Sequence, residues 1–315
     1  MKIGFCLPTE TENMGEDTAS GADVLRMARR AEAVGFDSVW LVDHFCYSAA
    51  AEMEALGATP PPELIGKVYG AWECLTTAAV LARETRRVEI GTLVVNTGYR
   101  NPALLARMAD TIDEFSQGRL ILGLGAGDAV SEHRAFGYSW ERRVARFEEA
   151  LQIIRPLLRG ETVTFEGEFY RTEGAQNVPR GPRPNGPPIM IGMLHGGPRM
   201  RRLIAQYADV WNCWLASTDS HPAAYAQIRD TMVEACERHG RDPATLERNV
   251  TARICPPGGA PKAEDMKPLR GSPAQVADTI AEFESLGVTH IGLWPHPNVE
   301  ASIDFIAEVI EACRR

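Results

Sequence analysis

The residue of this sequence that is best suited to acid–base chemistry is His44. It follows the largely apolar run 37–42, which has the composition of a buried strand, and it is preceded by Asp43, a carboxylate that could orient its ring. An imidazole titrates near neutral pH and can therefore both give and take a proton. A histidine that only caps the end of a strand would fit this position equally well, so position alone leaves both roles open.

A glycine-rich loop follows a second apolar run, at residues 120–124. Gly123, Gly125 and Gly127 stand at alternate positions, and Asp128 comes directly after them. Glycine carries no side chain, so such a loop lets the backbone lie against a flat or phosphorylated ligand. We therefore expect a ligand-binding loop here.

Two parallel strands must deliver these residues to a common edge. Residues 88–95 form a nearly continuous apolar run, as in a strand buried on both faces, and residues 120–124 repeat the pattern. Between them, Asn101 and Pro102 start a helix and Gly118 ends it. A strand–helix–strand unit of this kind places the loops that follow both strands on the same rim.

A third segment of interest is residues 195–199, with the sequence HGGPR. Two glycines have no side chains that would cover the backbone amides. Pro198 starts a helix, and the N-terminus of a helix attracts anions. The segment predicts a phosphate cradle, although an ordinary strand-to-helix turn would have the same sequence.

Other side chains near the predicted strand ends fit less specific roles. Trp211, Trp214 and Trp294 are close enough to the rim to line a pocket for a flat ring. His133 is expected at the surface. The seven histidines are spread over separate strand–helix units without an HExxH pattern, so we expect no metal site.

Composition and charge disfavour several classes of protein. The net charge of -9 disfavours nucleic-acid binding, which needs a basic face. Seven cysteines occur without a CxxC pair, as is typical of buried thiols in a reducing compartment. The first residues lead into a strand with no secretory leader, and no apolar run is long enough to span a membrane. We therefore expect a cytoplasmic protein that acts on small molecules.

The alternation of eight predicted strands with helices favours a TIM (β/α)8 barrel, a single α/β domain over residues 1–315. An open doubly wound sheet is the main rival, but no dinucleotide fingerprint follows the first strand. Three stretches interrupt the alternation: a long loop at 43–70, a hairpin insertion at 161–187 and a flexible loop at 256–271. Ligands of TIM barrels bind at the C-terminal ends of the strands, so the segments described above should face one mouth.

These segments resemble the bacterial luciferase-like family of flavin and deazaflavin oxidoreductases. The resemblance covers essentially the whole chain and is carried by WLVDHF at 40–45, GTLVVN to GLGAGD at 91–128, PPIMIGMLHGGPR onward at 187–212 and RGSPAQ to GLW at 270–294. It implies a luciferase-like TIM barrel with insertions, a cofactor ring across the mouth, and a non-prolyl cis peptide bond between Leu93 and Val94 behind that ring.

The resemblance also assigns roles to individual residues. The DHF motif matches the position at which the deazaflavin branch carries an acid–base histidine. His44 would therefore exchange a proton with the substrate, oriented by Asp43 or a neighbouring carbonyl. The phosphate would meet the backbone amides between Gly192 and Gly197. The implied cofactor-binding residues are Leu93, Val94, Asn96, Gly125, Gly127, Asp128, Gly192, Met193, Leu194, His195, Gly196 and Gly197.

The cofactor that the resemblance favours is the deazaflavin coenzyme F420, because GLGAGD and DHF match its reductases. The implied activity is hydride transfer between the deazaflavin C5 carbon and a small organic substrate that the sequence does not identify. One alternative is a monooxygenase that uses oxygen and reduced flavin mononucleotide (FMN) from a partner flavin reductase; another is a noncatalytic flavin-binding barrel. The resemblance also implies a homodimer formed through the helices beside the second and third strands.

Overall fold

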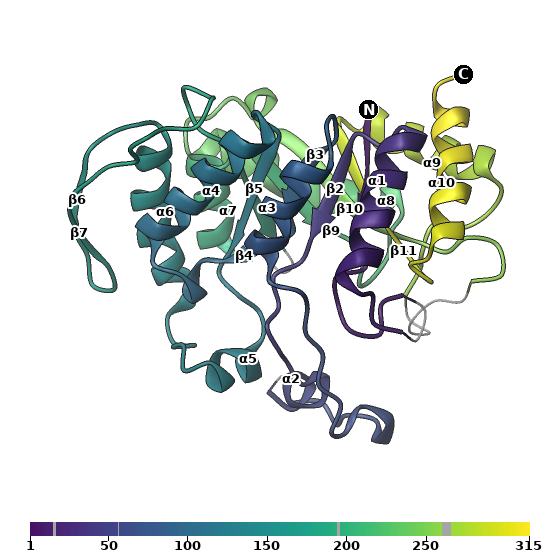
Figure 1. Cartoon of the computed structure of the whole chain (residues 1–315), viewed down its shortest axis with the longest axis horizontal. Coiled ribbons are helices and arrows are strands. Elements are labelled where there is room, and N and C mark those ends of the chain that lie inside the picture. Colours follow the sequence, from purple (N-terminus) through teal and green to yellow (C-terminus); the bar gives the residue numbers. More distant parts are fainter. Residues whose placement is uncertain (15–16, 56, 194–195, 260–265) are drawn as a thin grey trace.

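The computed structural model describes residues 1–14, 17–55, 57–193, 196–259 and 266–315. Within them, parallel strands surround a common axis (Figure 1). These strands are Lys2–Cys6 (β1), Ser38–Leu41 (β2), Glu89–Thr92 (β3), Val95–Asn96 (β4), Leu120–Gly125 (β5), Ile189–Met193 (β8), Val210–Trp214 (β9), Glu247–Ile254 (β10) and His290–Pro295 (β11). Their order is β3-β2-β1-β11-β10-β9-β8-β5-β4, and the pairing of β3 with β5 closes the barrel. Because β3 and β4 both pair with β5, they share one strand position, and the predicted TIM barrel is confirmed.

Helices between the strands cover the outside of the barrel. The α-helices are Gly21–Val34 (α1), Ala49–Ala55 (α2), Cys74–Glu84 (α3), Pro102–Ser116 (α4), Val130–Ala135 (α5), Arg143–Leu158 (α6), Pro198–Tyr207 (α7), Pro222–Arg238 (α8), Pro273–Ser285 (α9) and Glu300–Cys313 (α10). Short 3-10 helices occur at Pro62–Leu64, Thr97–Tyr99 and Pro243–Thr245. No helix in the described ranges is both long enough and apolar enough to cross a membrane.

The hairpin predicted within residues 161–187 is confirmed. Val163–Glu166 (β6) and Arg171–Ala175 (β7) pair antiparallel, and they project from one side of the barrel (Figure 1).

Helix α4 shows how local sequence sets these boundaries. The side chain of Asn101 accepts hydrogen bonds from two amides of the first turn at 3.0 and 3.2 Å, and Pro102 takes the first helical position. The predicted start of this helix is therefore confirmed. It ends before Gln117, because that residue already adopts the left-handed conformation (φ 60°) that we expected only at Gly118.

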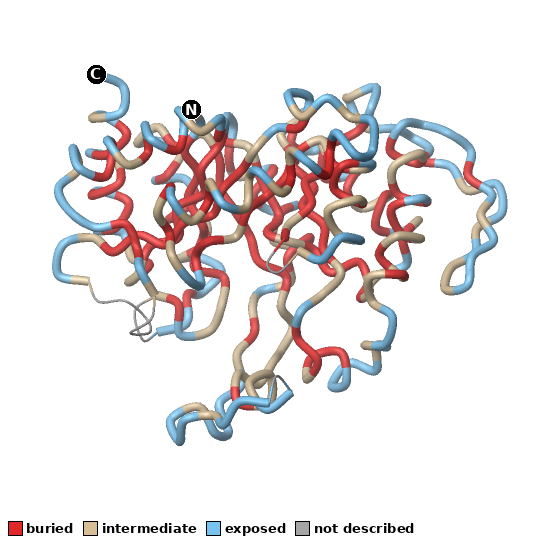
Figure 2. Tube along the Cα trace, turned by 180° about the vertical axis from the view of Figure 1, so that it is seen from behind, coloured by how far each residue is buried: buried red, intermediate tan, exposed pale blue. Residues whose placement is uncertain are grey.

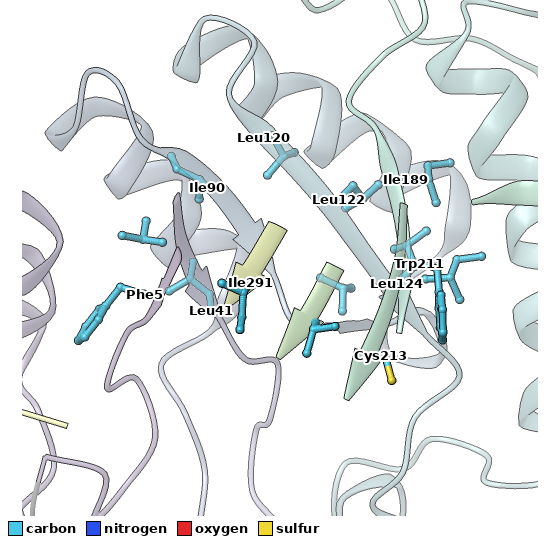
Figure 3. Close-up of a cluster of buried hydrophobic side chains, with 14 of the residues drawn as sticks. Phe5, Leu41, Ile90, Leu120, Leu122, Leu124, Ile189, Trp211, Cys213 and Ile291 are labelled. Carbon is cyan, nitrogen blue, oxygen red and sulfur yellow. The ribbon is translucent and has the colours of Figure 1, made fainter. Parts of the chain in front are cut away.

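Two groups of apolar residues form the core, one on each face of the strands. The larger group lies between the strands and the helices and includes Phe5, Leu122 and Ile291 (Figure 3). The smaller group fills the barrel and includes Trp40 and Met190. Successive side chains of a strand point to opposite faces, so the same strands supply both groups. Burial accordingly follows the strands and the helix faces that cover them (Figure 2).

The indole of Trp40, which is 2% exposed, fills the barrel below its mouth. A Cβ atom at Gly4 would lie 2.3 Å from Nε1 of this indole, and one at Gly91 would lie 2.1 Å from its Cε3. Such distances are too short for any side chain, so the indole requires glycine at both positions. The barrel is thus a packed core, and a ligand must bind at its C-terminal end.

The long loop at 43–70 is more ordered than expected. We predicted irregular structure, but the loop contains α2 and a 3-10 helix. The run AAAEMEA at 49–55 is made mostly of strong helix formers, which the nearby prolines obscured. Helix α2 packs against α5 at the end of the molecule opposite both chain termini (Figure 1). Part of the predicted flexible loop, residues 260–265, lies outside the described residues.

Candidate active site

His44 lies at the mouth of the barrel, just after β2, and it pairs with a glutamate from a distant segment. Its Nδ1 is 3.0 Å from Oε2 of Glu132 on α5. The histidine side chain is 23% exposed, whereas that of Glu132 is 1% exposed. No described residue forms a hydrogen bond with Nε2 of His44. A buried carboxylate therefore holds the ring from behind, and Nε2 is left for a ligand.

The carboxylate of Glu132 organises the backbone as well as the histidine. It accepts hydrogen bonds from the amides of Phe45 and Cys46, the latter at 3.1 Å, and from the hydroxyl of Tyr99 at 2.7 Å. Burial alone would raise the pKa of Glu132, but the hydrogen bond and charge of His44, with these other donors, hold it below its usual value. Glu132 is therefore an ionised acceptor that fixes the chain on both sides of the mouth.

The same contacts change the titration of His44. Burial alone would lower its pKa, but the hydrogen bond to Glu132 and the charges of Asp128 and Glu132 outweigh burial and raise the pKa to about 9. At neutral pH the ring is therefore protonated on both nitrogens. Because the folded pKa is raised, the pairing contributes its full stability below about pH 6.5 and loses it as the pH rises through about 9.

The carboxylate of Asp43 is bonded elsewhere. Arg100 donates to its two oxygens at 2.7 and 2.8 Å, and the amide of Asn96 donates at 2.9 Å. Arg100 also pairs with Glu73 at 2.5 Å. The expectation that Asp43 orients His44 is therefore wrong, because the planar guanidinium occupies both carboxylate oxygens. Asp43 instead joins the end of β2 to the loop after β4.

His133 is buried beneath the glycine loop, and the expectation that it lies at the surface is wrong. Its Nδ1 donates to the carbonyl of Ala129 at 2.8 Å, so Nε2 accepts from the side-chain amide of Asn96 at 3.3 Å. The Asn96 oxygen accepts from the amide of Gly98 at 2.9 Å. A Cβ atom at Gly127 would lie 2.4 Å from Nδ2 of Asn96. The glycine loop thus rests directly on the Asn96–His133 pair.

One wall of the mouth carries very little side-chain bulk. The peptide bond between Leu93 and Val94 is cis, as the resemblance implies. Leu93 is buried inside the barrel and Val94 is half-buried. A Cβ atom at Gly125 would lie 2.7 Å from Cγ2 of Val94, and one at Gly192 would lie 3.0 Å from Cγ1. Glycine at both positions therefore makes room for the Val94 side chain, and a flat ring fits a wall with so few side-chain atoms.

The start of α7 offers backbone amides to an anion. Gly197 is the N-cap of this helix, and no side chain caps its first turn. A Cβ atom at Gly196 would lie 1.8 Å from Sδ of Met193, so this turn packs tightly on the end of β8. The other two residues predicted here, Leu194 and His195, lie outside the described residues. The described part fits a phosphate group.

The opposite wall is aromatic. The rings of Trp214 and Trp294 are nearly perpendicular with centroids 5.4 Å apart, and the guanidinium of Arg253 lies 4.8 Å from the Trp294 ring. The expectation that Trp211 lines the mouth is wrong. It points to the other face of β9 and stacks on Tyr225 at 5.9 Å, among the helices.

Comparison with known proteins places this geometry in a family. The sequence model described as luciferase-like monooxygenase matches residues 1–265. The chain belongs to the luciferase-like monooxygenase family. The predicted family resemblance is thereby confirmed.

Two curated relatives illustrate its neighbours in the family. The chain is 31% identical over 211 residues to 5,10-methylenetetrahydromethanopterin reductase of Archaeoglobus fulgidus, covering 67% of this chain and 53% of that relative. It is 30% identical over 261 residues to F420-dependent glucose-6-phosphate dehydrogenase of Gordonia bronchialis, covering 81% and 68%. The chain spans about half the length of the first of these relatives.

A solved structure shows the same fold. An F420-dependent secondary alcohol dehydrogenase in complex with an F420–acetone adduct superposes with a TM-score of 0.78 at 22% identity, covering 100% of this chain and 99% of that one.

Proposed function

We propose that this protein is an oxidoreductase that depends on coenzyme F420 and transfers a hydride between the coenzyme and a small organic substrate. The observation that carries the proposal is the His44–Glu132 pair, which places a protonated imidazole at the mouth of the barrel, 23% exposed. The relatives named for F420-dependent reduction and dehydrogenation support the choice of coenzyme.

The residues at the mouth fit a deazaflavin. Val94 would support the ring from behind, and Leu93 would hold Val94 against the barrel interior. Gly125 and Gly192 make room for Val94, so that this side chain need not be pushed toward the ring. The phosphate would meet the amides at the start of α7. The remaining proposed contacts are Met193, Gly196 and Gly197 beside the phosphate, and Asn96, Gly127 and Asp128 along the glycine loop.

His44 performs the proton transfer in this proposal. The deazaflavin, when bound, supplies or accepts the hydride. Nε2–H of His44 donates a proton to the substrate, and Glu132 stabilises the charged ring before the transfer. A pKa of about 9 favours the donor role at neutral pH, and therefore reduction of the substrate. Asp43 acts only by positioning the loop that precedes His44.

A flavin-dependent monooxygenase is the second candidate, because the matching family model carries that description. In that case the same mouth would hold reduced FMN, a flavin reductase would be a partner, and His44 would handle a proton of the oxygenation reaction.

The exposed face of α3 and α4 supports a homodimer. Val80 on α3 is 44% exposed, and Leu104 and Phe115 on α4 are 54% and 67% exposed. Leu104 and Phe115 are eleven positions apart, which places them on the same side of the helix. An apolar surface of this kind is typical of an interface. The free and mostly buried cysteines support a reducing, cytoplasmic location.

The variant His44→Ala tests the catalytic role. Turnover should fall by about 100-fold or more, the usual contribution of a positioned acid, while coenzyme affinity stays within about twofold. Turnover is measured with a panel that includes glucose 6-phosphate and 5,10-methylenetetrahydromethanopterin. His239→Ala, at the exposed end of α8, is the matched control and should behave as wild type. Normal turnover of His44→Ala at saturating coenzyme would contradict the role.

A further inference from the structure

We propose that Arg253 binds an anionic group of the substrate, a carboxylate or a phosphate, at the mouth of the barrel. This inference rests on the F420-dependent function proposed above and defines the class of substrate for that site.

Arg253 points into the barrel near its open end. Thr251 and Asn249 on the same strand face the interior, because the side chain of Asn212 donates to their oxygens at 2.9 and 2.6 Å. Side chains two positions apart share a face of a strand, so Arg253 lies above Thr251, toward the mouth. It is 6% exposed.

The positive charge of Arg253 has little compensation. A guanidinium has five N–H donors. Among the described residues, its side chain makes one hydrogen bond, from Nε to the carbonyl of Ala216 at 3.3 Å, and stacks on Trp294. No described carboxylate forms an ion pair with it, although the charge of Glu10 acts on it. Burial lowers the pKa of Arg253, which shows that the surroundings disfavour its charge.

Two other arginines at least half-buried in the fold have partners supplied by the protein. Arg100, whose side chain is 8% exposed, binds the carboxylates of Asp43 and Glu73. Arg119 donates five hydrogen bonds to carbonyl and hydroxyl oxygens. A buried cation is costly unless it is paired and hydrogen-bonded. Within the described ranges, Arg253 therefore has no carboxylate partner of the kind that pairs with Arg100.

The position of Arg253 suits the substrate rather than the coenzyme. Strand β10 lies across the barrel from β4 in the closed strand order, so Arg253 faces the wall that carries Val94. The proposed phosphate site at α7 follows β8, at a different part of the rim. A substrate held between the two walls would place its anionic group on Arg253 and its reacting carbon toward the ring. The Trp294 ring against Arg253, itself in contact with Trp214, lowers the local polarity and would strengthen that interaction.

The test measures binding of inorganic phosphate and of acetate to the F420-loaded protein, by calorimetry at constant ionic strength with chloride as the reference anion. Bound coenzyme fills the phosphate site at α7, so a probe reports on the remaining mouth. We expect saturable binding that Arg253→Met weakens by about tenfold or more, since a guanidinium holds such anions with two hydrogen bonds. Tighter phosphate binding indicates a phosphorylated substrate, and tighter acetate binding indicates a carboxylated one.

The matched control is Arg248→Met on the same strand. Arg248 lies at the other end of β10, against Gly287, and its removal should leave probe binding unchanged. If Arg253→Met does not fold, Arg253→Lys replaces it; it keeps the charge but loses the planar fork, and should weaken binding severalfold.

Three results would overturn the proposal. The first is that neither phosphate nor acetate binds the wild type saturably, and the second is that they bind the wild type and the Arg253 variant equally well. The third is that the Arg253 variant also loses affinity for F420, which would assign Arg253 to the coenzyme. If the wild type does not bind F420 at all, the proposed function fails. In that case, phosphate and acetate binding is compared between the coenzyme-free wild type and the coenzyme-free Arg253 variant, and this comparison still tests whether Arg253 binds the anion.

Discussion

The pairing of His44 with Glu132 explains how a histidine at the barrel mouth can stay protonated at neutral pH. Partial burial would favour the neutral ring, yet the adjacent carboxylate reverses that preference and raises the pKa of His44 to about 9. Glu132 also accepts hydrogen bonds from the backbone that follows His44 and from the hydroxyl of Tyr99. The same carboxylate therefore sets both the charge and the position of the His44 ring.

The variant Glu132→Gln should therefore lower the pKa of His44 from about 9, because burial remains while the hydrogen-bonded carboxylate is lost and only the more distant charges, such as that of Asp128, still raise it. The alkaline limb of the activity profile should move to lower pH with it. Nuclear magnetic resonance titration of the His44 ring measures this without a substrate. Tyr99→Phe removes one donor but keeps the carboxylate, so it should leave the pKa of His44 high. An unchanged pKa in Glu132→Gln would show that Glu132 does not set the charge of His44.

The sequence identified His44 but not its partner. The position of His44 after a strand was visible, whereas Glu132 is 88 residues away and becomes a neighbour only when the barrel closes. The available signal was the acid in SEH at 131–133, a few residues after the glycine loop. Asp43 does not contact the ring of His44 for a physical reason: successive side chains at a strand end point to opposite sides, so neighbours in sequence need not meet.

At the scale of elements, the strand–helix–strand unit from β3 to β5 followed from its apolar runs and its caps, whereas the role of α2 did not. Glu52 on α2 accepts hydrogen bonds from the amides of Val130 and Ser131, both at 2.8 Å, and so caps α5, which has no side-chain cap of its own. Helix α2 thereby anchors the helix that carries Glu132. Such a cap, supplied from another element, leaves no local sequence pattern.

The wall formed by β4, β5 and β8 gives a second prediction. Gly125→Ala would place a Cβ atom 2.7 Å from Cγ2 of Val94 and push that side chain into the space proposed for the ring. F420 affinity, measured by fluorescence, should fall by about tenfold or more, equivalent to about 1.4 kcal/mol. Gly21→Ala is the control, because a Cβ there meets nothing within 4 Å. Unchanged affinity in Gly125→Ala would place the ring elsewhere.

At the scale of the whole molecule, the alternation of strands and helices was enough to predict the barrel, because each strand must bury two faces and each helix one. The assembly of the protein is a separate question, which the exposed apolar face of α3 and α4 raises. We predict that light scattering will give about twice the chain mass of 34.6 kDa. Leu104→Glu should yield monomers, because it buries a charge in the interface, and the similarly exposed Ile65→Glu should not. A wild-type monomer would contradict the dimer.

The most direct test of the central claim is an anaerobic titration of the purified protein with oxidised coenzyme F420 and, in parallel, with FMN, followed by fluorescence. We predict micromolar binding of F420 and binding of FMN weaker by about tenfold or more, or about 1.4 kcal/mol. A preference for FMN, together with oxygen consumption by the protein loaded with reduced flavin, would contradict the claim and identify a monooxygenase instead.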